Sequence, residues 1–293
     1  MAFAFKTTSG VAGQVRAIAQ EQVEKALVAI EQVADFDATV HSLRRRCKKL
    51  RGLLRMVKPH FKDFSEQNST VRDAAGVLGG ARDARVMVET LDALIGDDAG
   101  HGAAIQAIAA RQFLIERLER LSENSDQSET LQQYAKIIRK LESGISHWQF
   151  GEQGFAVIGD GLEQTYRQFR KFIADAEKDE SAEALHEWRK QAKYHGHHVS
   201  LLSHAAPDLL QARGKSVDRL GDYLGDHHNL AVLGDTLHEG GLGDIDAIDH
   251  AIEAKQHELA QSAFALGRQL TVEKAAALRQ RFTGYWQLLP EEN

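Results

Sequence analysis

The chain repeats one pattern at half its length, and this repetition constrains the fold more than any other feature. Residues 40–45 read VHSLRR and residues 185–190 read LHEWRK, so both follow the order apolar, histidine, any residue, apolar, arginine, basic. A second block, LGGARD at 78–83, aligns with LGDHHN at 224–229. The two offsets, 145 and 146 residues, differ by only one. Agreement between independent blocks indicates a duplicated structural unit.

The composition favours helices in both copies. Only three prolines, Pro59, Pro207 and Pro290, occur among the 293 residues, while Ala, Leu, Gln and Glu are plentiful. Long stretches therefore contain no helix breaker and few β-branched residues. We predict an all-α fold of two pseudo-symmetric helical bundles, residues 1–148 and 149–293, that arise from an internal duplication and surround a basic central channel.

Apolar periodicity and glycine-rich breaks divide each copy into six helices. The predicted ranges are 13–35, 38–58, 66–78, 82–95, 101–122 and 128–144 in the first copy, and 155–178, 182–204, 207–223, 227–239, 244–267 and 271–288 in the second. Pro59 and Pro207 each follow the helix that carries the histidine motif. We expect that helix to end there, because proline lacks the backbone N–H that would continue it.

Cysteine usage and hydropathy indicate a cytoplasmic protein. Cys47 is the single cysteine, so no internal disulfide can form, and this suits a reducing compartment. The N-terminus lacks the basic-then-apolar pattern of a signal peptide, and no apolar run approaches membrane-spanning length. We therefore expect no membrane partner.

Positive charge is concentrated in one segment. The net charge is −6, but residues 38–62 contain nine Lys or Arg and no Asp or Glu. An acidic protein with one concentrated basic element repels anions broadly and attracts them at one place. This distribution is typical of a binding site for a polyanion, although a solvated basic helix is the commoner meaning of a charge run.

The segment that contains His41 has two faces when its residues are placed about 100° apart around a helix axis. One face is cationic and the other apolar, and the copy around His186 shows the same division. The cationic faces are His41, Arg44, Arg45, Lys48, Arg51 and Arg55 in the first copy, and His186, Arg189, Lys190, Lys193 and His197 in the second. The apolar faces include Val40, Leu43, Cys47, Leu50, Leu53, Leu54 and Val57 in the first copy, and Leu185, Trp188, Ala192, Val199 and Leu202 in the second.

Cations in one stripe without acids repel one another unless an anion neutralises them. Phosphate suits such a stripe, because Arg offers a bidentate fork and Lys a point charge. The alternative is pairing with Asp and Glu of neighbouring helices. Because His, Arg and Lys recur at one spacing in both copies, we favour an anion site that both stripes line.

These residues resemble the CHAD family, the conserved histidine α-helical domain. The stretch 41–51, HSLRRRCKKLR, is similar to the family's His-x-x-Arg signature with its following basic residues, and LGGARD at 78–83 is similar to its second signature. In the second copy, Gly161 to Arg170 resembles the usual opening of that repeat, and 220–229 resembles its leucine-glycine-aspartate block. The chain departs from the pattern at His195-Gly196 and at Asn229, where an aspartate is usual.

The resemblance implies helical bundles around a basic pore that binds inorganic polyphosphate without catalysis, with no cofactor. We expect other polyanions to be possible ligands and polyphosphate granules to be a possible location. The predicted polyphosphate-binding residues are His41, Arg44, Arg45, Lys48, Lys49, Arg51, Arg55, Arg82, His186, Arg189, Lys190, Lys193, His197 and His228.

Three alternatives compete with this hypothesis. His195 and His198, three residues apart, could chelate a metal, but packing is the more common role of such histidines. Asp222, Asp226 and a neighbouring histidine could form a hydrolytic cluster on a phosphate polymer, although no nucleotide-binding loop or metalloprotease motif accompanies them. Nucleic acid, RNA above all, could enter a basic channel, but the stripes carry no aromatic platform apart from Tyr194.

The histidines of the second copy also predict a pH dependence. An unperturbed histidine titrates near pH 6.5. If His186, His197 and His228 did so, polyanion binding should strengthen as pH falls from about 8 to 6.

Overall fold

The computed structural model describes residues 3–79, 81–96, 101–123 and 126–291. Side chains 81–82 and 101–104 lie outside the described part. Within these limits the chain is helical and contains no strand, so the all-α prediction is confirmed. The helices are α1 (Val11–Glu31), α2 (Phe36–Val57), η1 (Lys58–His60), α3 (Phe64–Val77), α4 (Ala81–Gly96), α5 (His101–Glu123), α6 (Gln127–Ile145), α7 (Ala156–Asp179), α8 (Ala182–Leu201), η2 (Ser203–Ala205), α9 (Pro207–Glu239), α10 (Asp246–Leu270) and α11 (Ala275–Trp286).

One predicted helix break is wrong. The sequence predicts helices 207–223 and 227–239, whereas α9 runs without interruption from Pro207 to Glu239. A single glycine inside a helix, Gly225, costs only about 1 kcal/mol, which tertiary packing offsets. In the first half, Gly79 and Gly80 are consecutive, and there α3 and α4 are separate helices. As expected, α2 and α8 end before these prolines: Pro59 lies in η1 directly after α2, and Pro207 begins α9 after η2 has followed α8.

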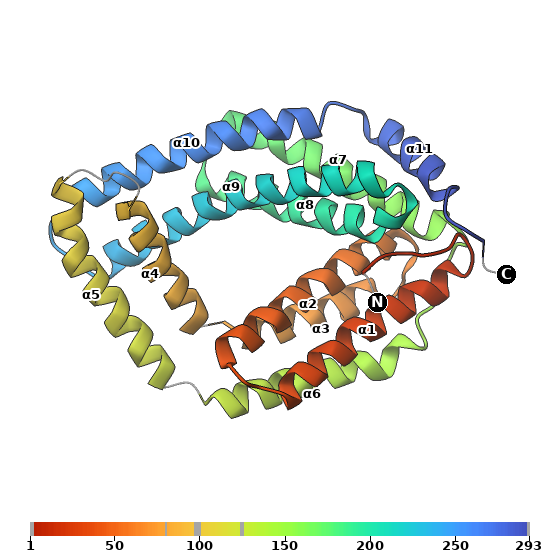
Figure 1. Cartoon of the computed structure of the whole chain (residues 1–293), viewed down its shortest axis with the longest axis horizontal. Helices are drawn as coiled ribbons and strands as arrows, with labels where there is room; N and C mark the ends of the chain where they lie inside the picture. Colours follow the sequence, from red (N-terminus) through yellow and green to blue (C-terminus); the bar gives the residue numbers. More distant parts are fainter. Residues whose placement is uncertain (1–2, 80, 97–100, 124–125, 292–293) are drawn as a thin grey trace.

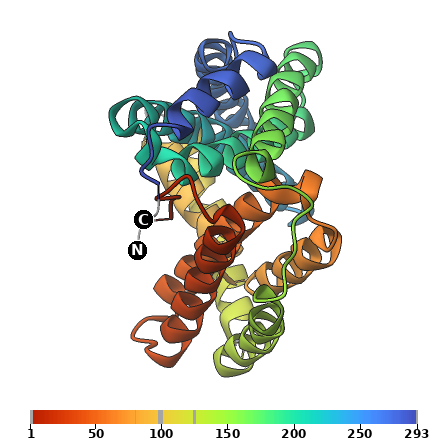
Figure 2. The same cartoon turned by 90° about the vertical axis from the view of Figure 1, so that its right-hand side faces the viewer.

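The helices form a ring of bundles (Figure 1). Helices α1, α2, α3 and α6 pack together on one side, and α7 to α11 on the other. The link between them is provided by α4 and α5, which leave the first group and pack against the distant ends of α9 and α10. Figure 2 shows the two groups one above the other. The predicted boundary between residues 148 and 149 lies between α6 and α7; it and the duplication remain predictions.

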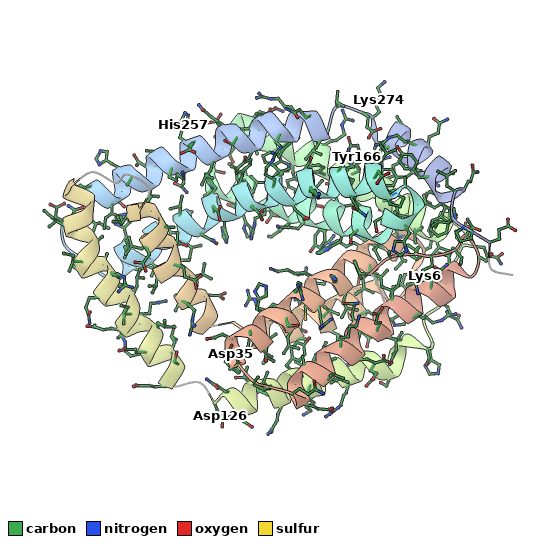
Figure 3. All side chains as sticks on the ribbon, viewed as in Figure 1. Lys6, Asp35, Asp126, Tyr166, His257 and Lys274 are labelled. Carbon is green, nitrogen blue, oxygen red and sulfur yellow. The ribbon has the colours of Figure 1, made fainter. Side chains whose placement is uncertain are left out.

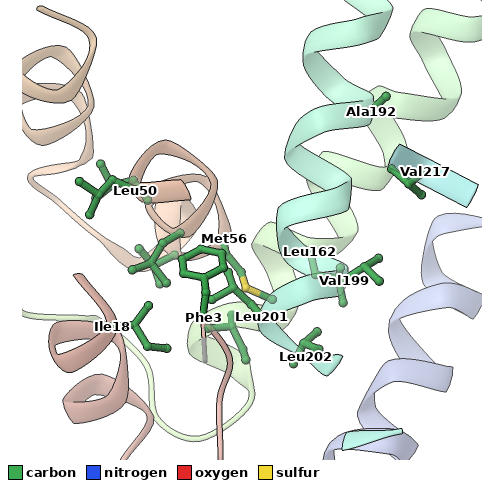
Figure 4. Close-up of a cluster of buried hydrophobic side chains, with 14 of the residues drawn as sticks. Phe3, Ile18, Leu50, Met56, Leu162, Ala192, Val199, Leu201, Leu202 and Val217 are labelled. Atoms are coloured by element: carbon green, nitrogen blue, oxygen red, sulfur yellow. The ribbon is translucent and has the colours of Figure 1, made fainter. Parts of the chain in front are cut away.

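Two hydrophobic cores hold this arrangement. The larger includes side chains from both groups, among them Phe3, Met56 and Leu201, which lie together in Figure 4. The smaller joins α4 and α5 to α9 and α10 through Leu91, Leu233 and others. Every residue of the two predicted apolar faces is buried. Burial of one large aliphatic side chain stabilises the fold by roughly 1.5–3 kcal/mol, so these faces fix α2 and α8 firmly.

Glycines bring α2 into close contact with the second group. A Cβ atom at Gly161 of α7 would lie 1.9 Å from the Met56 carbonyl oxygen, so only glycine allows this crossing. A Cβ atom at Gly52 would lie 2.6 Å from the Cβ of His197 in α8. Beside it, the His198 imidazole Nε2 lies 3.0 Å from the Gly52 carbonyl oxygen, to which it donates. Both contacts anchor the C-terminal half of α2.

No helix in the described part of the chain has the length and apolar character needed to cross a membrane.

Candidate anion-binding cleft

The cationic faces of α2 and α8 meet in a cleft beside the Gly52–His197 crossing. From that crossing the two ribbons diverge towards α4 (Figure 1). Two adjacent hollows lie between the helices, with volumes of about 610 and 150 Å³, and both are lined by Lys48, Lys193 and His197. Side chains of α2, α8 and α9 extend into the space between the helices (Figure 3). We name the two hollows together the cationic cleft.

Positive charge dominates the lining of the cationic cleft. Nine cationic side chains line it: Arg44, Arg45, Lys48, Lys49, Arg51, Arg189, Lys190, Lys193 and Lys215. His41 and His197 add two imidazoles, and Asp218 is the one carboxylate among the described residues of the lining. The structure thus brings ten of the fourteen predicted binding residues together. Lys215 of α9 escaped prediction, because it lies outside both repeated blocks and no motif surrounds it.

On the α2 side, several cations are held in place by their neighbours. The Arg44 guanidinium donates to the Leu78 carbonyl oxygen at 3.0 Å and lies 3.4 Å from the Asp83 carboxylate. It therefore joins α2 to the α3–α4 junction as well as lining the cleft. Arg51 donates to the Asn68 side-chain oxygen at 3.3 Å. Burial, and then the charges of Arg45 and Arg46, lowers the pKa of Lys49. Crowded cations of this kind favour an anion.

On the α8 side, glycines of α9 provide space for the cations. A Cβ atom at Gly221 would lie 2.6 Å from the Lys193 ammonium, and one at Gly225 would lie 3.3 Å from the Arg189 guanidinium. Lys193 also lies 3.6 Å from the Asp222 carboxylate. The Arg189 Nε is buried and has no hydrogen-bond partner among the described residues. These two cations are therefore confined side by side against α9.

The remaining predicted residues lie elsewhere. Arg55 lies over the Tyr194 ring, 4.2 Å from its centroid, and lines a separate pocket. The His186 and His228 rings contact each other, with centroids 4.1 Å apart, outside the linings of the cationic cleft. Arg82 belongs to α4, but its side chain lies outside the described part.

The premise behind the expected pH dependence of binding, an ordinary histidine pKa near 6.5, does not hold for these side chains. Burial, followed by His198 and Lys49, lowers the pKa of His197 to about 3. Burial, followed by His186 and Arg189, lowers the pKa of His228 to about 4. Burial and the charges of Lys190 and Arg189 also lower the pKa of His186. Desolvation and the nearby positive charges therefore disfavour the charged form of all three side chains in the free protein.

His195 and His198 have structural roles. Both side chains are fully buried. The His195 Nε2 accepts a hydrogen bond from the Arg213 Nε at 3.1 Å, and its ring stacks on Phe169. His198 donates to Gly52, as described above. Among the described residues, no group of three or more His, Cys, Asp or Glu side chains could hold a metal ion.

The aspartates of the proposed hydrolytic cluster separate into different surroundings. Asp222 pairs with Lys193, whereas Asp226 lines another pocket between α4, α9 and α10. Burial, followed by the neighbouring Asp222, raises the pKa of Asp226. Asp222 therefore lies next to the cationic cleft, where its carboxylate balances the charge of Lys193.

Fold and site together define a class of all-helical proteins in which two motif helices enclose a cationic cleft. A family model described as "CHAD domain" matches residues 17–238. This is more than half of the chain, and the chain therefore belongs to the CHAD domain family, which confirms the resemblance seen in the motifs.

Solved structures share the fold at low sequence identity. PptA from Streptomyces chartreusis is 13% identical, with a TM-score of 0.57 over 97% of this chain and 100% of that chain. The CHAD domain from the plant Ricinus communis, known from a crystal structure, is 16% identical, with a TM-score of 0.58 over 97% of this chain and 95% of that chain. No curated protein matches this chain. At such identities the likeness concerns the fold alone.

Proposed function

We propose that the protein binds inorganic polyphosphate, without catalysis, in the cationic cleft between α2 and α8. The observation that carries this proposal is the lining, in which the described residues include nine cations and one carboxylate, Asp218. Asp83, Asp222 and Glu187 lie outside the lining and balance only Arg44, Lys193 and Lys190. Arg45 is exposed and forms no ion pair with a described carboxylate, so its charge is available to a ligand. A polymer of phosphates presents regularly spaced anionic oxygens, which suit both guanidinium and ammonium groups. Membership of the CHAD family supports the same ligand.

Nucleic acid is the main competing ligand. Proteins that bind single strands without sequence preference stack bases on exposed aromatic rings. Among the described residues that line the cationic cleft, the one Phe, Tyr or Trp side chain is Tyr194, which is only 9% exposed and is covered by Arg55. The cleft therefore offers phosphate contacts without a stacking surface. A competition experiment tests this: unlabelled long-chain polyphosphate should displace labelled polyphosphate at much lower phosphate concentration than single-stranded RNA does. Equal potency would favour RNA.

Binding without hydrolysis is part of the proposal. Among the described residues, Asp218 is the one carboxylate that lines the cationic cleft, so the lining offers little general-base capacity. Incubation of the protein with long-chain polyphosphate and Mg²⁺ or Mn²⁺ should release no more orthophosphate than a sample without protein. Release that scales with protein concentration would establish a phosphohydrolase instead.

We further propose that the protein is located at cytoplasmic polyphosphate granules. A fluorescent fusion should coincide with stained granules, and a variant with a reversed cleft charge should be diffuse. A granular location of that variant would show that another surface directs the protein.

A further inference from the structure

A third polar pocket lies where α2 ends between α7 and α8. Its volume is about 400 Å³. Within the described part of the chain, its lining consists of three cations and three primary amides, with the buried Thr165 beside them and no carboxylate: Arg55, Lys58, Arg167, Gln164, Gln168 and Gln191. We name it the amide pocket.

The amide pocket is the neighbour of the cationic cleft. Arg51 and Tyr194 line the cleft, and Arg55, one turn after Arg51, lines the amide pocket. Both guanidinium groups lie over the Tyr194 ring, 5.9 and 4.2 Å from its centroid. On α8, the consecutive residues Lys190 and Gln191 line the cleft and the amide pocket respectively. The linings of the two spaces therefore adjoin at the Tyr194 ring and its two arginines.

The cations of the amide pocket retain capacity for an anion. The Arg55 Nε is buried and has no hydrogen-bond partner among the described residues. Lys58 lies over the Phe64 ring, 5.2 Å from its centroid, and no described carboxylate lies within ion-pairing distance of its ammonium. The Arg167 Nη2 pairs with Glu163 at 2.5 Å, on the same helix, and Glu163 is outside the lining. A buried guanidinium N–H without a partner costs free energy that a phosphate oxygen could recover.

We propose that the amide pocket is a phosphate subsite at which a polyphosphate chain continues beyond the cationic cleft. Carboxamide N–H groups donate to phosphate oxygens without adding charge, and the three cations neutralise the phosphates. The chain would cross the molecule past Tyr194, so long polymers gain contacts that short ones cannot reach. This inference rests on the proposed function and assigns to it a preference for chain length.

The test compares two probes, long-chain inorganic polyphosphate and tripolyphosphate, on the full-length protein. Lys58→Gln with Arg167→Gln should lower affinity for the long chain about tenfold and leave tripolyphosphate binding within about twofold. The log–log salt slope for the long chain should become shallower by roughly 1.4, which corresponds to two lost phosphate contacts. Gln164→Glu, a substitution at an exposed position, should also weaken long-chain binding selectively by repulsion.

A matched control is Lys62→Gln with Lys171→Gln. These exposed lysines lie next to the same region but do not line the amide pocket, so long-chain affinity should be unchanged. An equal loss for both probes, or wild-type long-chain affinity in both the double variant and Gln164→Glu, would overturn the subsite. If wild-type protein binds neither probe, the proposed function itself fails, which distinguishes the two failures.

Discussion

The helices α2 and α8 carry the same motif in different surroundings. On α2, His41, Arg45 and Lys48 are exposed along the edge of the cleft. On α8, Arg189 and Lys193 are half-buried against Gly225 and Gly221, with Asp222 nearby. The exposed α2 cations therefore supply charge at low desolvation cost. The α8 cations are held in fixed positions, but the Asp222 carboxylate neutralises part of their charge.

The predicted alignment extends this contrast to the buried faces. Where α2 places Leu50 and Leu53 in the core, α8 places His195 and His198 at the corresponding positions, and all four side chains are fully buried. Leucine is indifferent to pH, but a buried histidine is stable only when neutral. Sensitivity to acid should therefore reside in α8, and most of the binding charge in α2.

The largest effect should come from reversing the exposed charge of α2. Arg45→Glu with Lys48→Glu changes the lining by four charges and should weaken long-chain polyphosphate binding by at least about a hundredfold. Lys136→Glu with Arg139→Glu on α6 is the matched control, with exposed cations at the same spacing outside the cleft. Similar losses in both variants would mean that overall charge, rather than this cleft, governs binding.

The buried histidines of α8 should make the fold sensitive to acid. Burial lowers the pKa of His198 to about 4 in the folded protein, against about 6.5 in the unfolded chain. The unfolded chain therefore binds more protons between these values, and stability is lost as pH falls through this window. At pH 5 the loss due to His198 should be roughly 2 kcal/mol.

The variant His198→Gln removes this proton site and keeps a donor for the Gly52 carbonyl oxygen. Denaturant unfolding at pH 7 and pH 5 should show a smaller decrease in the free energy of unfolding than in wild type. His147→Gln, at an exposed position, should keep the wild-type decrease. An unchanged pH dependence in His198→Gln would show that His198 does not carry the acid sensitivity.

A smaller effect should follow from closing the space beneath Lys193. The Cβ atom of Gly221→Ala would meet the flexible end of Lys193, which can move, so affinity should fall about fivefold as the ammonium is displaced. Stability should hold or rise, since alanine favours helix over glycine by up to about 1 kcal/mol. In Gly234→Ala the new Cβ would lie 3.7 Å from Ile252, an ordinary contact. That control should gain stability without losing affinity; a loss equal to that of Gly221→Ala would contradict the role of Lys193.

The smallest effect concerns pH and binding. Because His186 and His228 have lowered pKa values, wild-type affinity for long-chain polyphosphate should change little between pH 8 and 6.5. His186→Gln with His228→Gln should give the same flat profile. If the affinity of the wild-type protein rose steeply as the pH fell and the double variant lost this rise, the bound polymer would be shown to restore ordinary titration to these histidines.

The sequence predicted the parts that depend on local pattern. Helical periodicity separated Leu43 and Leu50 from Arg44 and Arg51 correctly, because burial of one face is decided within a few turns. The continuity of α9 was not predictable in this way. Gly221 and Gly225 have weak helix propensity, but they pack against side chains of α8 that are remote in the sequence, and this packing outweighs the propensity. The lowered histidine pKa values were not predicted from the sequence either, because the desolvation of a side chain depends on helices that are remote in the sequence.

The central claim is that many cations of one cleft contact successive phosphates of one polymer. The most direct test is the affinity of the wild-type protein for long-chain polyphosphate over a series of salt concentrations. Each neutralised phosphate should contribute roughly −0.7 to the log–log slope, so the account predicts a slope steeper than about −3. A slope near −1, which corresponds to only one or two contacts, would contradict it.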